Sequence, residues 1–70
     1  MQTLVFNTTT RTVKIYDSFP HNDVSKIYDI QNVPTVKFYE GFYEVIQEES
    51  DRKYPVLRVP IAITNMVIEK

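Results

Sequence analysis

Apolar and polar residues alternate along much of the chain, and this period of two is typical of half-buried β-strands. In the segment Arg11–Asp17, Val13 and Ile15 point to one side, while Lys14 and Tyr16 point to the other. A strand with one face on a core and one face in solvent produces this pattern. The segment therefore predicts a strand, and the same reasoning applies to several later segments.

A β-hairpin is expected at the N-terminus. Thr3–Phe6 is a short strand candidate, and the run Asn7–Thr10 follows it directly. Asparagine tolerates left-handed backbone and hydrogen-bonds to its own neighbouring backbone, so this run has turn chemistry. The turn would lead back into the strand Arg11–Asp17.

The segment Ser18–Asn32 departs from the alternation. Pro20 interrupts any strand, and Asn22 is a suitable residue to cap a helix. Three apolar residues then follow at helical spacing, namely Val24, Ile27 and Tyr28. One or two helical turns are predicted over Asp23–Asp29. Such a short helix must dock on a sheet to be stable.

A second β section begins after Pro34. Thr35–Glu40 alternates, with Val36 and Phe38 on one side and Lys37 and Tyr39 on the other, and Gly41 is the only glycine of the chain. Gly41 suits either a tight hairpin turn or a bulge in one long strand. A turn or sharp bend is favoured, because glycine is the residue that adopts a positive φ without strain.

Three further strands are expected, at Tyr43–Glu48, Tyr54–Val59 and Thr64–Glu69. The charged run Glu48–Lys53 predicts a solvated loop between the first two. Pro55 and Pro60 limit Tyr54–Val59 to a sheet edge or to the ends of a strand, because proline cannot donate a hydrogen bond to a neighbouring strand. A short connection, Pro60–Ile63, would lead into the last strand.

The kinds of apolar residue support a β fold. The sequence contains 9 valines, 7 isoleucines and 7 threonines but only 2 leucines and 1 alanine. β-Branched residues pack well on a pleated surface, whereas Leu and Ala are the strongest helix formers. We therefore expect residues 1–70 to form a single small, mainly β domain. It would be a small barrel or a strongly twisted antiparallel sheet of about five to six strands with one short helix.

Several kinds of chemistry are not supported by the composition. There is no cysteine and only one histidine, His21, so no metal site or cofactor is expected. Ser18, His21 and Asp23 fall within six residues of one loop, whereas the members of a catalytic triad come from separate elements. A lone glycine cannot build a phosphate-binding loop. We therefore expect a protein without enzymatic activity.

Size and charge indicate where the protein acts and which partners it has. No apolar run approaches the roughly 20 residues that span a bilayer, and the N-terminus lacks a basic segment, so we expect a cytoplasmic protein without membrane contact. The net charge of −1 makes nucleic acid an unexpected partner. A chain of 70 residues with no disulfide has a small core, so we expect a homodimer, which would bury more of its surface.

The best candidate partner-binding surface lies around Gly41. Phe38 and Tyr39 cannot face the same side of one strand, so an aromatic ring is expected at the surface. Tyr39 and Tyr43 are assigned to the surface as binding residues, since a tyrosine hydroxyl tolerates water, and Phe38 and Phe42 to the core. Four nearby carboxylates would steer the surface to a basic partner; they belong to Glu40, Glu44, Glu48 and Glu49.

An alternative is a small nucleic-acid-binding barrel. Aromatic and basic residues interleaved on strands can bind a single strand by stacking and charge. The residues that would form this surface are Tyr16, Tyr39, Lys14, Lys37 and Arg58. The acidic residues on the same strands argue instead for solvated strand faces with cross-strand pairing. A subunit that is stable only in a homo-oligomer is a third alternative.

The C-terminal segment Pro60–Glu69, PIAITNMVIE, resembles the ends of two families of small barrels. One is the segment that closes SH3 domains, and the other is the asparagine-containing strand of Sm-like RNA-binding proteins. The likeness covers about ten residues, and it implies a small barrel without implying any binding residue.

The whole chain resembles the small early or accessory proteins of bacterial viruses. The likeness rests on length, acidic balance, the absence of Cys and Trp, and the phrases VPTVK at Val33–Lys37 and PVLRVPI at Pro55–Ile61. Such proteins commonly inhibit or redirect a host protein. The resemblance implies a viral accessory protein that binds a bacterial protein in the host cytoplasm.

Overall fold

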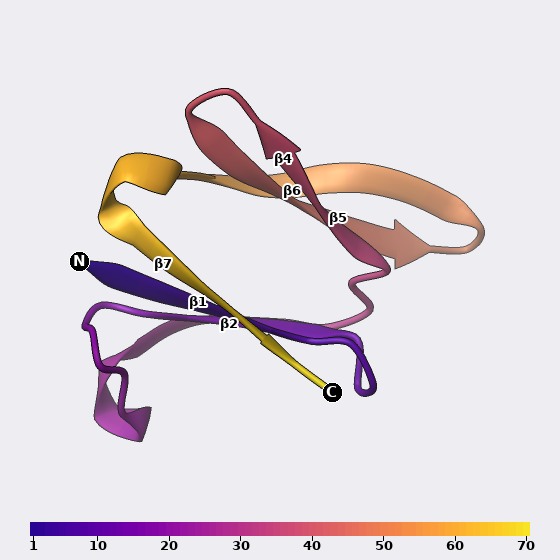
Figure 1. The fold of residues 1–70 in the computed structure, drawn as a ribbon. Helices are drawn as coiled ribbons and strands as arrows, with labels where there is room; N and C mark the ends of the chain where they lie inside the picture. Colours follow the sequence, from indigo (N-terminus) through magenta and orange to yellow (C-terminus); the bar gives the residue numbers. More distant parts are fainter.

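The computed structural model describes all 70 residues as two β-sheets that face each other. In Figure 1 the four-stranded sheet lies below and the three-stranded sheet above. The four-stranded sheet has the order β3-β2-β1-β7, formed by Lys26–Ile30, Thr12–Tyr16, Gln2–Asn7 and Thr64–Glu69. The three-stranded sheet has the order β4-β5-β6, formed by Thr35–Tyr39, Phe42–Glu49 and Arg52–Pro60. Two short 3-10 turns, η1 and η2, cover Asp23–Ser25 and Ile61–Ile63.

The predicted N-terminal hairpin is confirmed. Strands β1 and β2 pair antiparallel, from Thr3 opposite Tyr16 to Asn7 opposite Thr12. The Asn7 side-chain oxygen accepts hydrogen bonds from the backbone N–H groups of Thr9 and Thr10, at 3.0 and 2.9 Å. The asparagine therefore organises the turn through its own side chain, as its sequence position indicated.

The predicted helix over Asp23–Asp29 is wrong. Only Asp23–Ser25 forms a single 3-10 turn, and Lys26–Ile30 forms strand β3 on the edge of the four-stranded sheet. The helical spacing of three apolar residues was a weak signal over so short a segment, and pairing with β2 supplies backbone hydrogen bonds that an isolated helical turn lacks. A bulge in β3, where Tyr16 pairs with Lys26 and Ile15 with Tyr28, leaves Ile27 without a partner.

Gly41 forms a hairpin turn, as favoured from the sequence. Tyr39 pairs with Phe42, so Glu40 and Gly41 alone connect β4 to β5. Gly41 has a φ of +90°, and no atom would contact a Cβ placed there. The backbone conformation, and not lack of space, therefore requires glycine at this position.

The predicted loop over Glu48–Lys53 is a much tighter turn. Glu49 pairs with Arg52, which leaves Ser50 and Asp51 as the connection, with φ values of 51° and 65°. Two consecutive positive φ values match the right-handed twist of a hairpin, but Asn-Gly is the residue pair that favours them. Strand β5 continues to Glu49 and strand β6 begins at Arg52, so both strands extend into the charged run. Their charged side chains remain at the surface, where a strand tolerates them.

Replacing Ser50-Asp51 by Asn-Gly is expected to raise the free energy of unfolding by about 0.5–1 kcal/mol, because the new residues adopt a positive φ with less strain. Thermal unfolding followed by circular dichroism would measure the gain. Gly41→Ala is the matched opposite change and is expected to lower the melting temperature. If neither the Asn-Gly replacement nor the single substitution Asp51→Gly raises the melting temperature, the two-residue turn is contradicted.

The molecule is not a closed barrel. The pairing order leaves an unpaired edge on each of β3, β7, β4 and β6. The arrangement is also not wholly antiparallel, because the C-terminal strand β7 runs parallel to β1, with Leu4 opposite Met66. The extra strand relative to the sequence prediction is β3. Strand β6 contains Pro55 and Pro60 and lies at an edge, which is one of the two positions that these prolines allow.

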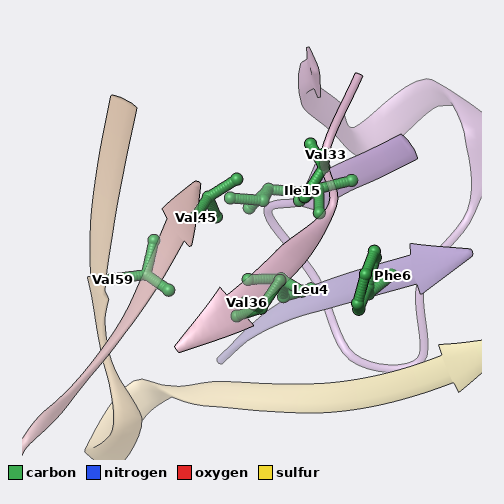
Figure 2. Close-up of a cluster of buried hydrophobic side chains, with 8 residues drawn as sticks. Leu4, Phe6, Ile15, Val33, Val36, Val45 and Val59 are labelled. Atoms are coloured by element: carbon green, nitrogen blue, oxygen red, sulfur yellow. The ribbon is translucent and has the colours of Figure 1, made fainter. Parts of the chain in front are cut away.

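The core lies between the two sheets (Figure 2). From the four-stranded sheet Leu4, Phe6, Val13 and Ile15 point inward; from the other Val36, Val45 and Val59 do, and Val33 joins them from the connection before β4. We call these two facing surfaces the inner faces, and the opposite ones the outer faces. The fold contains no helix whose length and hydropathy would let it cross a membrane.

Candidate protein-binding surface

Strand β4 is an open edge that carries exposed aromatic rings. It pairs with β5 on one side only, and its other side has no neighbour. Phe38 is 65% exposed and Tyr39 is 44% exposed. Because successive residues of a strand point to opposite faces, one ring lies on each face of the sheet. The end of β4 therefore offers unpaired backbone groups between two exposed aromatic side chains.

Each exposed ring is held by a ring on the neighbouring strand. Phe38 meets Tyr43 edge to face at 5.2 Å between centroids, and Tyr39 stacks on Phe42 at 5.0 Å. Both pairs are directly opposed in the register of β4 and β5. Aromatic pairs of this kind contribute beyond their buried area and restrict the rotamers of both rings. The surface is therefore partly preorganised.

The sequence assignment of the aromatic residues needs correction. Phe38 is not a core residue, although it shares the inner face with Val36, because it lies near the hairpin turn and 65% of it stays exposed. Tyr43, assigned to the surface, is half-buried and packs against the core. Tyr39 is exposed as predicted, and Phe42 is half-buried on the outer face. The hairpin thus carries Phe38 beyond the packed part of the sandwich.

Glu44 does not act as a free steering charge. It is only 5% exposed, and Arg58 Nε donates a hydrogen bond to its Oε2 at 2.8 Å. The guanidinium of Arg58 also lies 5.0 Å from the centre of the Phe42 ring. Lys37 lies opposite Glu44 on β4. Glu44 is therefore the centre of a polar cluster that supports Phe42 from the side of β6.

The other predicted carboxylates have different surroundings. Glu48 forms an ion pair with Arg11 at 2.8 Å, and Glu49 accepts a hydrogen bond from the hydroxyl of Tyr54 at 3.0 Å. That hydrogen bond raises the pKa of Tyr54, with smaller contributions from desolvation and from the Glu49 charge. Glu40 is exposed in the β4–β5 turn and has no side-chain partner. Of the predicted acidic residues, only Glu40 lies beside the exposed rings with its charge free.

The residues of the nucleic-acid alternative fall on two different sheets. Lys14 and Tyr16 lie on the outer face of the four-stranded sheet, while Lys37, Tyr39 and Arg58 lie on the outer face of the other. The ring of Tyr16 is buried and contacts His21 at 4.7 Å between centroids. No single surface brings all five residues together.

Sequence reasoning also missed two exposed apolar residues, Ile27 and Tyr28, because it placed them on a buried helical stripe. Their β-branched and aromatic character was the available signal for a strand. The bulge at Ile27 breaks the regularity of the β3 edge, whereas β4 is regular from Thr35 to Tyr39. Bulges protect edges from pairing, so β4 is the better template for a partner strand.

Comparison with known proteins gives no relative. No family model matches the chain, no curated protein is significantly similar to it in sequence, and no solved structure is significantly similar to its fold. Within the structure, no three His, Asp or Glu side chains are grouped so that they could hold a metal ion.

Proposed function

We propose that this protein is a non-enzymatic protein-binding module that captures an extended segment of its partner along the free edge of β4. The observation that carries the proposal is the combination of an unpaired regular edge with Phe38 and Tyr39 exposed on its two faces. Exposed edges pair readily with strands of other chains, and exposed aromatic residues are the usual anchors of interfaces.

The recognition would have two parts. Backbone N–H and C=O groups of β4 would pair with the incoming strand and supply affinity that does not depend on its sequence. Phe38 on the inner side and Tyr39 on the outer side would contact alternate side chains of that strand and supply specificity. Lys37 and Glu40, both exposed and free of ion pairs, would favour opposite charges at matching positions of the partner.

The resemblance to viral accessory proteins suggests how such binding would be used. A module of this size that covers part of a bacterial protein would inhibit or redirect it by steric occlusion, with no chemistry of its own. Its action would take place in the host cytoplasm. The nucleic-acid alternative receives less support, because its aromatic and basic residues lie on two outer faces.

The test begins with capture of partners from a bacterial lysate and their identification by mass spectrometry. Phe38→Ala and Tyr39→Ala are then each expected to weaken binding by about 1–3 kcal/mol, the range of interface hot spots. Affinity would be measured by calorimetry with the purified partner. Val24→Ala is the matched control, since Val24 is 96% exposed but lies in η1, away from β4.

Two results would contradict the proposal. One is a partner whose affinity is unchanged by both aromatic substitutions. The other is strong, salt-sensitive binding of an oligonucleotide, which would favour the alternative function. Melting temperatures of all variants, measured in parallel, separate a loss of binding from a loss of folding.

A further inference from the structure

The outer face of the four-stranded sheet contains a hollow that the proposed binding edge does not use. Its volume is about 180 Å³, and its lining includes Val5, Lys14, Tyr16, His21 and Glu69. Pockets for drug-sized ligands usually measure about 300–1,000 Å³, so this hollow fits a smaller molecule. Most of its lining is polar.

The register of the sheet places opposite charges on two sides of the hollow. Lys14 on β2 lies opposite Val5 of β1, while Glu69 on β7 lies opposite Asn7 of β1. The backbones of β2 and β7 are therefore separated by two strand spacings, about 10 Å. The buried side chain of Val5 lies between them and forms an apolar floor.

Neither the Lys14 ammonium group nor the Glu69 carboxylate forms an ion pair within the protein. The three ion pairs of the structure involve Arg11, Lys26 and Arg58, and neither Lys14 nor Glu69 takes part in one. Asp29, which lies opposite Lys14 on β3, is already paired with Lys26 at 3.2 Å. A cation and a carboxylate in one small hollow, each lacking a protein partner, can both be satisfied by a ligand that carries the two complementary charges.

An aromatic wall completes the hollow on the side of β2. The Tyr16 ring is buried with its hydroxyl free of protein hydrogen bonds, and His21 covers it at 4.7 Å between ring centroids. This wall offers both an apolar surface and hydrogen-bonding groups. It would suit the body of a ligand whose charged ends face Lys14 and Glu69.

We propose that this hollow binds a small zwitterion of amino-acid size, with its carboxylate on Lys14, its ammonium group on Glu69, and its side chain along Tyr16 and His21. A simple anion would be repelled by Glu69, and a simple cation by Lys14, so the pair of charges selects for a molecule with both. This site is on the opposite sheet from β4 and stands independently of the proposed protein binding.

The experiment is an NMR titration of the ¹⁵N-labelled protein with each standard amino acid, with acetate and methylammonium as probes of the two half-ligands. At least one amino acid is expected to shift the amide signals of β1, β2 and β7 in a saturable manner. Lys14→Met and Glu69→Gln should each weaken that binding about tenfold or more, as removal of a charged hydrogen bond does. The matched controls Lys53→Met and Asp51→Asn remove charges of the same two signs at exposed positions of the other sheet and its turn, and should leave binding unchanged.

Three outcomes would overturn the proposal. The first is that no amino acid gives a saturable shift at about 10 mM, a concentration at which even weak millimolar sites are filled. The others are that acetate or methylammonium alone binds as tightly as the amino acid, or that the control variants lose as much affinity as the Lys14 and Glu69 variants. Melting temperatures of the four variants verify that each remains folded.

Discussion

Leu4→Ala is expected to lower the free energy of unfolding by about 2–5 kcal/mol, the usual cost of truncating a fully buried leucine. Leu4 is 0% exposed and lies on β1, between the strands β2 and β7, in the cluster that joins the two sheets. Removal of its side chain leaves a cavity that neighbouring strands cannot close without breaking their pairing. A chain of 70 residues has a total stability of only about 4–10 kcal/mol, so this single truncation would remove a large fraction of it.

Urea denaturation followed by circular dichroism measures this effect, and Phe38→Ala provides the contrast. Phe38 has the larger side chain, but 65% of it is exposed. We expect its truncation to cost less than about 1 kcal/mol, since little of the ring leaves a packed environment. Equal losses for the two variants would mean that Phe38 packs in the core and that the β4 surface is wrongly assigned.

The second large effect concerns Glu44 and Arg58. Arg58→Met keeps the aliphatic stem but leaves the buried Glu44 carboxylate without its hydrogen-bond donor, so we expect a loss of about 1–3 kcal/mol in unfolding free energy. The figure is below that for a fully buried ion pair because the Arg58 side chain is 65% exposed. Loss of the contact with Phe42 adds a smaller part.

A double-mutant cycle isolates the interaction. The pair Glu44→Leu with Arg58→Met is expected to restore most of the stability, because replacing both polar partners removes the uncompensated charge. Arg11→Met is the matched control, since Arg11 pairs with Glu48 at the same distance of 2.8 Å but both side chains are more exposed than Glu44. It should cost less than about 1 kcal/mol. A double variant as unstable as Arg58→Met alone would show that Glu44 contributes through something other than this pair.

Local sequence signals were reliable where one residue type has a conformational property that others lack. Asn7 formed its own turn through its side chain, and Gly41 took a positive φ in a tight hairpin. Strand β6, which contains Pro55 and Pro60, lies at an edge, one of the positions that proline allows. These outcomes depend on the covalent structure of single residues and need no knowledge of the rest of the fold.

Local signals failed where a partner strand made the decision. The β-branched and aromatic residues of Asp23–Ile30 favour a strand only weakly over a marginal helical turn. The unpaired edge of β2 decides for the strand, because it offers backbone hydrogen bonds. The charged run at Glu48–Lys53 likewise became strand, because pairing of β5 with β6 outweighs the polarity of the side chains.

The sequence placed the candidate surface around Gly41, but it assigned some of the residues there wrongly to the core or to the surface. Alternation established by itself that Phe38 and Tyr39 face opposite sides and that the aromatic residues cluster around Gly41, since side-chain direction in a strand follows from backbone geometry alone. Only the tertiary structure decided that Phe38 lies beyond the packed sandwich while Tyr43 reaches the core, and that Glu44 is buried under Arg58. Burial depends on where the opposite sheet ends, and that is a property of the packing of distant strands.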